Sequence, residues 1–441
     1  MSSLRALLTG LLCAIVLSDG AAQPTQRFTL EECVRYALAH QPALLAAREQ
    51  LTLTEIDNRI ALSAWLPSVA LSGNAQHYFQ RPVSIFPDFQ DPDSGATTEV
   101  EIGTINSSTV TASVQQTLYN PTVAAAYRRQ APLLERSRLA IEEEEIAVRE
   151  TVATAFYRAA RARELLTLLT TDLARQERAL RDARLLFDNG LNDKVDYKRA
   201  TITRNRTEVA LQNAIIEEQS RVAELKQAMG YPNVQPLELA WNLELLAASF
   251  TDSLPLLDAG QRVELRRLAV AERLLALDAL FYRRAWLPDV YLGGTYNINW
   301  QSNEISTLYD RAFPNALASV NVSVPLFTGG RRFRQIERQS VLRRQLSYDV
   351  LALRDRIGRE YRVAYGSYDQ ALNTYRTARE NVALAEEIYA VVDLQYREGI
   401  APFLEVVIAE NDLQAARQNV VNSLIDAALA RISVQRAAGT L

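Results

Sequence analysis

The sequence is poor in the residues that build metal sites, disulfide frameworks and nucleic-acid surfaces. Among 441 residues it has two histidines (His40, His77) and two cysteines (Cys13, Cys33). These are too few for a His/Cys metal cluster or a disulfide framework within one chain. The 48 basic and 52 acidic residues leave a formal charge of −4, whereas nucleic-acid binders usually carry a basic excess. We therefore expect no metal, no cofactor and no nucleic-acid partner.

Glycine, proline and long apolar runs are also scarce. The 16 glycines and 15 prolines interrupt few segments, which favours long helices. After residue 23 there is no run of 18 apolar residues, so we expect no membrane-spanning helix. The HExxH, GxSxG and Walker motifs are missing, and no acid–base pair can be argued from spacing. We predict that the protein is not an enzyme.

The first residues have the pattern of an export signal. Arg5 precedes the apolar stretch Ala6–Leu17, and small residues around Ala22 follow it. A basic start, an apolar core and a small-residue end are typical of a cleaved signal peptide, here residues 1–22. A short buried helix is the alternative. The mature chain is thus predicted to be exported, with Cys33 as a lone thiol packed in a helix.

Two similar halves make up the rest of the chain. The segment Ala64–Val69 matches Ala285–Val290, and Leu186–Gly190 matches Gln395–Gly399. The offset falls from 221 to 209 residues between these two matches. The first half therefore has a dozen extra residues, which we place in a long loop over 81–105. Repetition on this scale indicates a duplicated structural unit.

Long paired helices are predicted in both halves. An apolar seam keeps unbroken steps of three and four residues over Tyr361–Tyr396. The positions 209 residues earlier, over Val152–Phe187, are apolar except Gln176. A seam with a period of 3.5 residues over five heptads is typical of a coiled coil. Each long helix ends near a glycine suited to a left-handed cap, Gly190 or Gly399, and a second helix returns from there.

Four shorter segments change to a period of two residues, at 69–79, 107–118, 290–300 and 317–327. Apolar side chains alternate with Ser, Thr, Asn and Gln, no formally charged residue occurs, and aromatic residues gather toward the ends. About ten residues suffice for a tilted membrane-spanning strand. A soluble sheet on a core is the alternative, although its wet face would usually carry Lys or Glu. The predicted polar, pore-lining face has Thr109, Thr111, Ser113, Gln115, Thr117, Thr295, Asn297, Asn299, Ser319, Asn321 and Ser323.

These segments define the expected organisation of the two repeats. Repeat 1, residues 23–259, has a helix over 29–64, strands over 69–79 and 107–118, a helical hairpin over 121–229 and a connector over 230–258. Repeat 2, residues 260–441, has a helix over 260–285, strands over 290–300 and 317–327, and a helical hairpin over 331–438.

The number of strands has a physical consequence if they span a membrane. Membrane barrels need about eight strands or more, and an open sheet edge in lipid leaves backbone groups unpaired at several kcal/mol each. Several copies must therefore share one barrel. A barrel lined by hydroxyls and amides and continued by a helical tube is a conduit.

The order of these features resembles the outer membrane efflux protein family, the TolC-like exit ducts of tripartite pumps and type I secretion systems. The resemblance rests on the opening Leu30-Glu31-Glu32, the Trp-Leu-Pro entries to the strands, Leu326–Gly330, the paired tips and the closing Gly439–Leu441. It implies an α+β membrane protein with a long antiparallel α-helical coiled-coil barrel. It also implies four transmembrane strands per protomer, which make 12 in a homotrimer, and an equatorial domain that includes 230–258. Its implied partners are outer-membrane lipid, a periplasmic adaptor protein and an inner-membrane pump.

The resemblance also assigns roles near the hairpin tips. It implies that a ring of Glu405 carboxylates, with Asp196 as the counterpart in the first repeat, constricts the pore and favours cations. A solvated carboxylate on a helix surface is the alternative. The sequence departs from the family pattern at Ile408, in place of a second acid, and at Ala401, in place of a basic residue. The implied adaptor-docking tips are Gly190, Leu191, Asn192, Gly399, Ile400, Ala401 and Pro402.

A protein of another class would share part of this pattern. An exported soluble coiled-coil scaffold with a small β module would also show long seams and short strands. The uncharged alternating strands and their aromatic ends favour the duct.

Overall fold

The computed structural model of the protein describes residues 27–87, 95, 97–190, 193–251 and 254–441. The predicted signal peptide over 1–22 and the tip residues Leu191 and Asn192 lie outside this part of the chain. The chain divides into two compact units. The hairpin unit comprises Met1–Ala46, Glu142–Arg262 and Asp355–Leu441, and the sheet unit comprises Ala47–Ile141 and Val263–Arg354.

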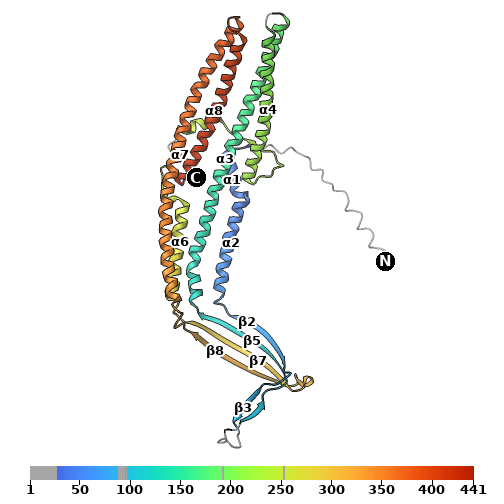
Figure 1. The fold of residues 1–441 in the computed structure, drawn as a ribbon, viewed down its shortest axis with the longest axis vertical. Coiled ribbons are helices and arrows are strands. Elements are labelled where there is room, and N and C mark those ends of the chain that lie inside the picture. The colour runs from blue at the N-terminus through green and yellow to red at the C-terminus, as the bar shows by residue number, and fades with distance from the viewer. Residues whose placement is uncertain (1–26, 88–94, 96, 191–192, 252–253) are drawn as a thin grey trace, which may run out of the picture. The chain divides into compact units, whose positions relative to one another are not determined.

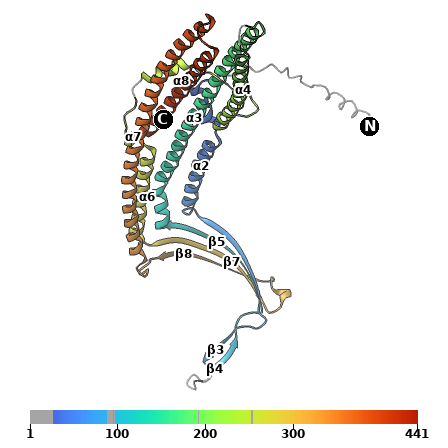
Figure 2. The same cartoon turned by 45° about the horizontal axis from the view of Figure 1, so that its top comes forward.

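The sheet unit contains a four-stranded antiparallel sheet in the order β2-β5-β7-β8 (Figure 1). Its strands bend along their length, as Figure 2 shows. Within the described residues, β2 and β8 each pair with one neighbour, so both are edge strands. The four strands are β2 (Ser68–His77), β5 (Asn106–Tyr119), β7 (Asp289–Ser302) and β8 (Ala312–Ser323).

The last strand differs from its predicted range of 317–327. It begins earlier because Ala312 pairs opposite Trp300, and its pairing with β7 ends where Ser323 lies opposite Asp289. Pro325, two residues further on, has no N–H to donate to a strand ladder. The alternation of apolar and polar residues in the sequence continues past Ser323, but the backbone pairing with β7 ends there.

The predicted loop over 81–105 contains a second, smaller sheet. Strands β3 (Val83–Pro87) and β4 (Thr97–Glu101) pair antiparallel, and Arg81 forms an ion pair with Glu101. The β-branched residues of both strands favour extended backbone. The extra residues of the first repeat therefore form a β-hairpin in place of an irregular loop.

The predicted helix over 29–64 is two helices, α1 (Leu30–His40) and α2 (Pro42–Ser63). Gln41 between them is extended, with φ −65° and ψ 121°, a conformation favoured because the ring of a following proline crowds a residue in the helical region. Thr29 and Glu32 form a reciprocal capping box that starts α1. Cys33 of α1 is fully buried, and burial raises the pKa of its thiol to about 12.

Two helical hairpins form the body of the hairpin unit. The first consists of α3 (Pro121–Asp188) and α4 (Lys194–Met229), and the second of α7 (Arg331–Arg397) and α8 (Phe403–Ala438). The partners of each hairpin lie side by side in Figures 1 and 2. Helices α3 and α7 have 68 and 67 residues, about 100 Å each at 1.5 Å per residue; both also contribute their first turns to the sheet unit.

Both predicted seams are confirmed by burial. Every predicted seam position of α3 and of α7 is buried or half-buried, with Val152 and Ala159 fully buried on α3 and Tyr368 and Ala385 buried on α7. Helix α8 supplies much of the core, through Leu413, Leu424, Ile425 and Val434 among others. None of the helices among the described residues combines the length and the apolar character that crossing a membrane requires.

The remaining elements are short. The connector after α4 begins at Gly230, which has a φ of +70° and caps that helix. Gly230 also lies so close to the backbone of His40 that a Cβ on it would be 2.8 Å from the His40 carbonyl oxygen. The connector then forms β6 (Glu238–Leu239), which pairs in parallel with β1 (Arg27–Phe28), and α5 (Leu243–Ala248). Three single turns, η2 (Ser249–Thr251), η3 (Ala259–Gln261) and η4 (Ile305–Thr307), and helix α6 (Val263–Arg284) complete the fold.

Candidate channel face and hairpin tips

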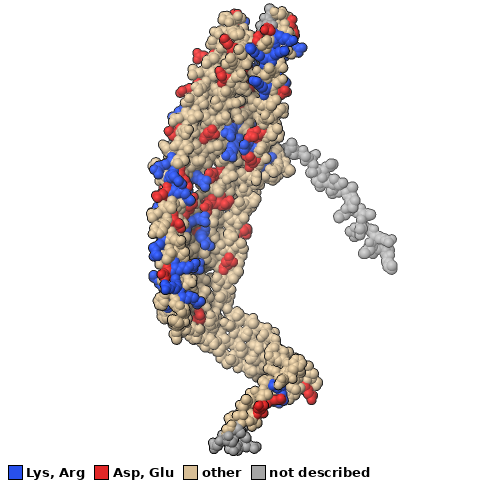
Figure 3. All heavy atoms as spheres, viewed as in Figure 1, with Lys and Arg blue, Asp and Glu red and all other residues tan. Residues whose placement is uncertain are grey.

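One face of the four-stranded sheet is mainly polar and almost free of charge. Residues paired directly opposite one another share a face, and the register places Thr111 opposite both Ser72 and Asn297. Repeating this step along the sheet brings all eleven predicted polar residues of β5, β7 and β8 onto the same face. Apart from Asp289 at the start of β7, the four strands carry no formally charged side chain. In Figure 3 the surface over these strands shows neither basic nor acidic colour.

Side-chain hydrogen bonds join the polar face across strands. Thr111 Oγ1 donates to Asn297 Oδ1 over 2.7 Å, and Asn297 Nδ2 donates to Asn315 Oδ1 over 2.8 Å. Thr109 Oγ1 donates to Asn299 Oδ1 over 2.9 Å. Asn315 belongs to the same face but was outside the predicted fourth strand, which began two residues later. The ladder holds amides and hydroxyls in place without a fixed charge.

The opposite face of the sheet is apolar and exposed. Its side chains include Val69, Leu71, Val114, Leu292, Tyr296, Val320 and Val322, which are between 42 and 76% exposed. A contiguous apolar surface of this kind is rare on a soluble monomer and marks contact with a membrane or another protein. No part of the chain that the structure describes covers this face as a core.

Both hairpins end in glycine-capped tips. Gly190 and Gly399 adopt φ of +73° and +76°, a region that suits glycine because it has no Cβ. Gly399 N–H donates to Tyr396 O over 3.0 Å, and Ile400 N–H donates to Gln395 O over 2.8 Å, which satisfies carbonyls at the end of α7. Pro402 then forms the N-cap of α8, as Asp193 does for α4.

The two predicted constriction residues occupy the first turns of the returning helices. Glu405 is exposed in the first turn of α8, and Asp196 is half-buried in the first turn of α4. Below them the two hairpins touch, because Phe403 of α8 is buried with Ala183 of α3 and Ala200 of α4. Glu405 therefore projects from a turn that is anchored on the first hairpin.

A buried charged cluster joins the two hairpins further from the tips. Arg175 of α3 lies 3.1 Å from Asp172 of the same helix (Nη2 to Oδ1) and 3.7 Å from Glu410 of α8 (Nη1 to Oε1). Asp172, Glu410 and the neighbouring Gln176 are only 5 to 6% exposed. One arginine thus faces two buried carboxyl groups, one from each hairpin.

Burial dominates the electrostatics of this cluster. It raises the pKa of Glu410, against the lowering effects of the Gln176 hydrogen bond and of Arg175. It also raises the pKa of Asp172, which Arg175 and Arg417 oppose. Because burial outweighs the nearby positive charge, these carboxyl groups keep a proton to a higher pH than free carboxyl groups do.

Sequence reasoning missed this cluster because it followed apolar residues only. Gln176 was the one polar position of the first seam, and Glu410 interrupts the buried row formed by Val406, Ala409 and Leu413. A polar residue within a buried apolar row was the signal that could have found both. In the described residues, no group of three or more His, Cys, Asp or Glu is arranged to hold a metal ion.

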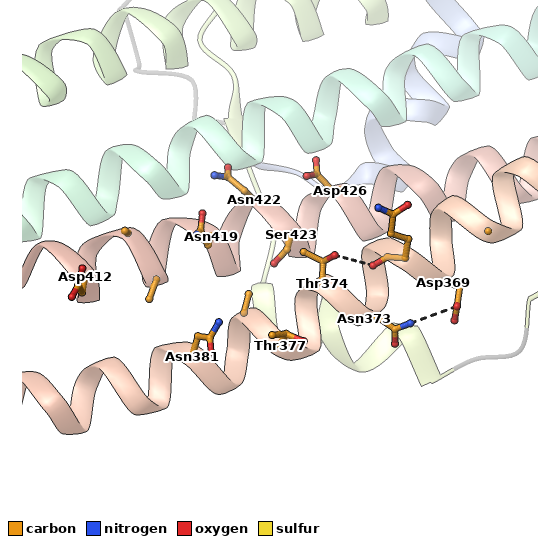
Figure 4. Close-up of a pocket in the computed structure, with 15 residues that line it drawn as sticks. Asp369, Asn373, Thr374, Thr377, Asn381, Asp412, Asn419, Asn422, Ser423 and Asp426 are labelled. Atoms are coloured by element: carbon orange, nitrogen blue, oxygen red, sulfur yellow. Dashed lines mark hydrogen bonds between the residues drawn. The ribbon is translucent and has the colours of Figure 1, made fainter. Parts of the chain in front are cut away.

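A polar groove follows the second hairpin on another side. It lies between α7 and α8, has a volume of about 1060 Å³, and is shown in Figure 4. Asn373, Thr377 and Asn381 line it from α7, and Asn419 and Asn422 line it from α8. Small apolar residues complete its walls beside the amides, hydroxyls and carboxylates, so the groove is wide enough and polar enough to hold water.

Comparison with known proteins shows which family has this architecture. The model of the outer membrane efflux protein family matches residues 34–231 and 259–440. No curated protein sequence matches the chain significantly. Among solved structures, the chain is similar in fold to the channel-forming protein CusC, with a TM-score of 0.72 and 15% identity over 93% of this chain and 92% of that one.

Two further structures are comparably similar. The outer membrane protein VceC of Vibrio cholerae has a TM-score of 0.65 and 18% identity over 93% of this chain and 96% of that one. The CmeC outer membrane channel of Campylobacter jejuni has a TM-score of 0.70 and 15% identity over 93% of this chain and 85% of that one. The family match covers both repeats, including all four strands and both hairpins. The resemblance inferred from the sequence is confirmed, and the chain belongs to the outer membrane efflux protein family.

Proposed function

We propose that the protein is a passive exit duct of the outer membrane, in which three copies form one channel that extends into the periplasm. The duct lowers the barrier for solutes to leave the cell and supplies no energy. An inner-membrane pump supplies the energy, and a periplasmic adaptor protein connects the pump to the hairpin tips. No residue of the chain has a catalytic role in this proposal.

The observation that carries the proposal is the two-sided sheet. One face exposes apolar side chains, and the other holds an uncharged hydrogen-bonded ladder. Lipid tails can cover the first face, because its aliphatic side chains make no hydrogen bonds that lipid would break. Water and solutes accept the second. A soluble protein gains nothing from leaving the first face uncovered.

The sheet edges support a shared barrel. Strands β2 and β8 each lack a second neighbour within the described residues, and unpaired backbone groups in lipid cost several kcal/mol each. In a ring of three copies, β8 of one copy pairs with β2 of the next. All edges are then paired, and the barrel has four strands from each copy.

The hairpin tips support docking and ion selection. Exposed Ile400 and the glycine caps at Gly190 and Gly399 present backbone and apolar surface to an adaptor. Glu405 projects from the first turn of α8, so three copies would bring three carboxylates around one axis. Such a ring attracts cations and repels anions.

Extraction from purified outer membranes tests the proposal against a soluble scaffold. We expect the protein to stay in the membrane through high-salt and alkaline washes and to leave it only with detergent. Purified protein in planar bilayers should then show stepwise conductance. Release by salt without detergent, or a membrane left insulating by well-folded protein, would refute the duct.

A further inference from the structure

The segments that join the helices to the four-stranded sheet carry only basic charge. The ten residues next to each strand at this end of the sheet are 58–67, 120–129, 279–288 and 324–333. They contain no Asp or Glu, although acidic residues outnumber basic ones in the whole chain. Figure 3 shows basic side chains gathered beside the uncoloured surface of the sheet. We call the seven basic residues of these segments the arginine collar: Arg59, Arg128, Arg129, Arg283, Arg284, Arg331 and Arg332.

Most of the collar has no carboxylate partner. Arg129 is paired, with its Nη1 3.3 Å from Oδ1 of Asp278. Five other guanidinium groups are exposed and form no ion pair within the part of the chain that the structure describes, namely those of Arg59, Arg128, Arg283, Arg284 and Arg331. A guanidinium presents a planar fork of N–H donors that matches the oxygens of a phosphate. The collar is therefore a surface suited to phosphate groups.

Two of these arginines line a common pocket between α3 and α6. Arg128 comes from α3 and Arg284 from α6, and the pocket has a volume of about 90 Å³. That is roughly three times the volume of one water molecule in the liquid. Ala124, Ala125 and Leu280 are among its apolar walls. Two positive groups beside apolar walls suit a ligand that is anionic at one end and apolar at the other.

The strand register places this pocket next to the apolar face of the sheet. Thr117 of the polar face lies opposite Tyr291, but the ladder then shifts and Tyr119 lies opposite Val290. Val290 in turn lies opposite Val322 of the apolar face. The bulge thus turns Tyr119 onto the apolar face, and Tyr119 lines the pocket. The pocket therefore adjoins the surface that we assign to lipid.

The pocket lies away from the edges through which copies pair in the proposed trimer. Strand β5 leads into α3, α6 leads into β7, and β5 and β7 are the two central strands of the sheet. One chain therefore supplies the whole pocket. Large side chains at the same end of the sheet are also uncovered, with Trp286 55%, Leu66 66% and Phe327 88% exposed. Aromatic residues beside basic ones are typical of the boundary between lipid and water.

We propose that Arg128 and Arg284 bind the phosphate of an anionic phospholipid in the leaflet of the outer membrane that faces the periplasm. The acyl chains of this lipid run along the apolar face of the sheet, and the rest of the collar attracts further anionic lipid. The proposal rests on the proposed function, since it requires that face to be in a membrane. The other end of the sheet has four acidic and two basic residues over 78–87, 97–105 and 303–311, so the bound lipid also determines which way the sheet is inserted.

Native mass spectrometry of the purified trimer in a nonionic detergent tests the pocket, with phosphatidylglycerol as the probe. We expect one tightly bound lipid per copy. Binding should be roughly tenfold weaker in Arg128→Gln with Arg284→Gln, because both charge-assisted contacts to the phosphate are lost. The matched control, Arg283→Gln with Arg331→Gln, removes the same charge from the collar outside the pocket and should bind as the wild type does. Ala125→Met fills the pocket without changing the charge and should also release the lipid.

Each other outcome has a defined meaning. Equal loss of lipid in the two arginine pairs, or full binding in Ala125→Met, overturns the pocket in favour of a diffuse attraction by the collar. Binding of zwitterionic phosphatidylcholine or of inorganic phosphate as tight as that of phosphatidylglycerol overturns the assignment to an anionic phospholipid. A trimer that conducts in planar bilayers but holds no phosphatidylglycerol overturns this site and leaves the duct intact. Wild-type protein that is monomeric and does not conduct would overturn the proposed function itself.

Discussion

Arg175 forms ion pairs with carboxyl groups of both hairpins, so its removal should weaken the contact between the hairpins. In Arg175→Met, the carboxyl groups of Asp172 and Glu410 remain buried without their shared cation. Removing one partner of a buried ion pair typically costs about 3 to 5 kcal/mol. We take the lower end, because the Arg175 side chain is 21% exposed. About 3 kcal/mol corresponds to roughly a hundredfold change in an equilibrium constant at 1.4 kcal/mol per factor of ten.

The cost should appear in hairpin separation as well as in global stability. Glu410 belongs to α8 and Asp172 to α3, so the variant weakens a contact between the hairpins and not within one. We expect a higher open probability in planar bilayers and a lower unfolding temperature. The double variant Arg175→Met with Glu410→Gln removes the uncompensated charge of α8, and it should recover part of both effects. If Arg175→Met gates and unfolds as the wild type does, the cluster does not hold the hairpins.

The same cluster predicts the direction of a pH effect. Burial raises the pKa of Glu410 and Asp172 where the two hairpins are in contact, so this arrangement binds protons more tightly than one in which the hairpins are separated. Its stability is then largest in mild acid and falls as pH rises from about 4.5 through the raised pKa values. Asp393 also raises the pKa of Glu410, and Arg417 opposes the rise in the pKa of Asp172. Open probability should therefore fall on acidification, and Glu410→Gln should weaken that dependence. Opening on acidification, with the same slope in both proteins, would refute the reasoning.

Three further predictions concern the tip, a cap and the sheet. Glu405→Gln should reduce cation selectivity in reversal-potential measurements at unchanged trimer yield, and unchanged selectivity would remove Glu405 from the constriction. Gly230→Ala should lower the unfolding temperature more than Gly190→Ala. Both glycines have positive φ, but a Cβ at Gly230 would also lie 2.8 Å from the His40 backbone, whereas a Cβ at Gly190 would meet no atom within 4 Å. On the sheet, Leu71→Arg should impair membrane insertion by about 2 to 4 kcal/mol if the residue is near the middle of the bilayer, whereas Ser72→Arg on the polar face should insert normally; equal insertion of the two variants would contradict the assignment of the faces.

The regular elements could be predicted because their patterns repeat. The seams over Val152–Phe187 and Tyr361–Tyr396 extend over five heptads, so one exception did not hide them. The strands were found because two-residue alternation determines the face of each side chain, and any register that pairs Thr111 with Asn297 also aligns their neighbours. Local signals gave the helix ends too, since glycine at 190 and 399 is suited to positive φ.

The errors arose where backbone geometry or pairing decided and side-chain pattern did not. Helical periodicity continues through Gln41, but that residue is extended, as the following Pro42 favours. Alternation continues past Ser323, but the pairing of β8 ends there. The hairpin of β3 and β4 has few residues and no long pattern, so its proline-rich surroundings outweighed its β-branched residues.

The sheet and the first hairpin are incomplete in the same physical sense. The sheet has two edges whose backbone groups need partners, and α4 has a row of β-branched side chains that no other part of the described chain covers. For the sheet, an edge that can pair with each of these is present on the same chain, as the opposite edge strand. In the proposed trimer each copy pairs one sheet edge with the opposite edge of the next copy, and closure of such a heterologous contact into a ring leaves no edge unpaired. The enclosed passage is then a consequence of pairing every edge, which is why an exit duct can be built without any residue devoted to catalysis.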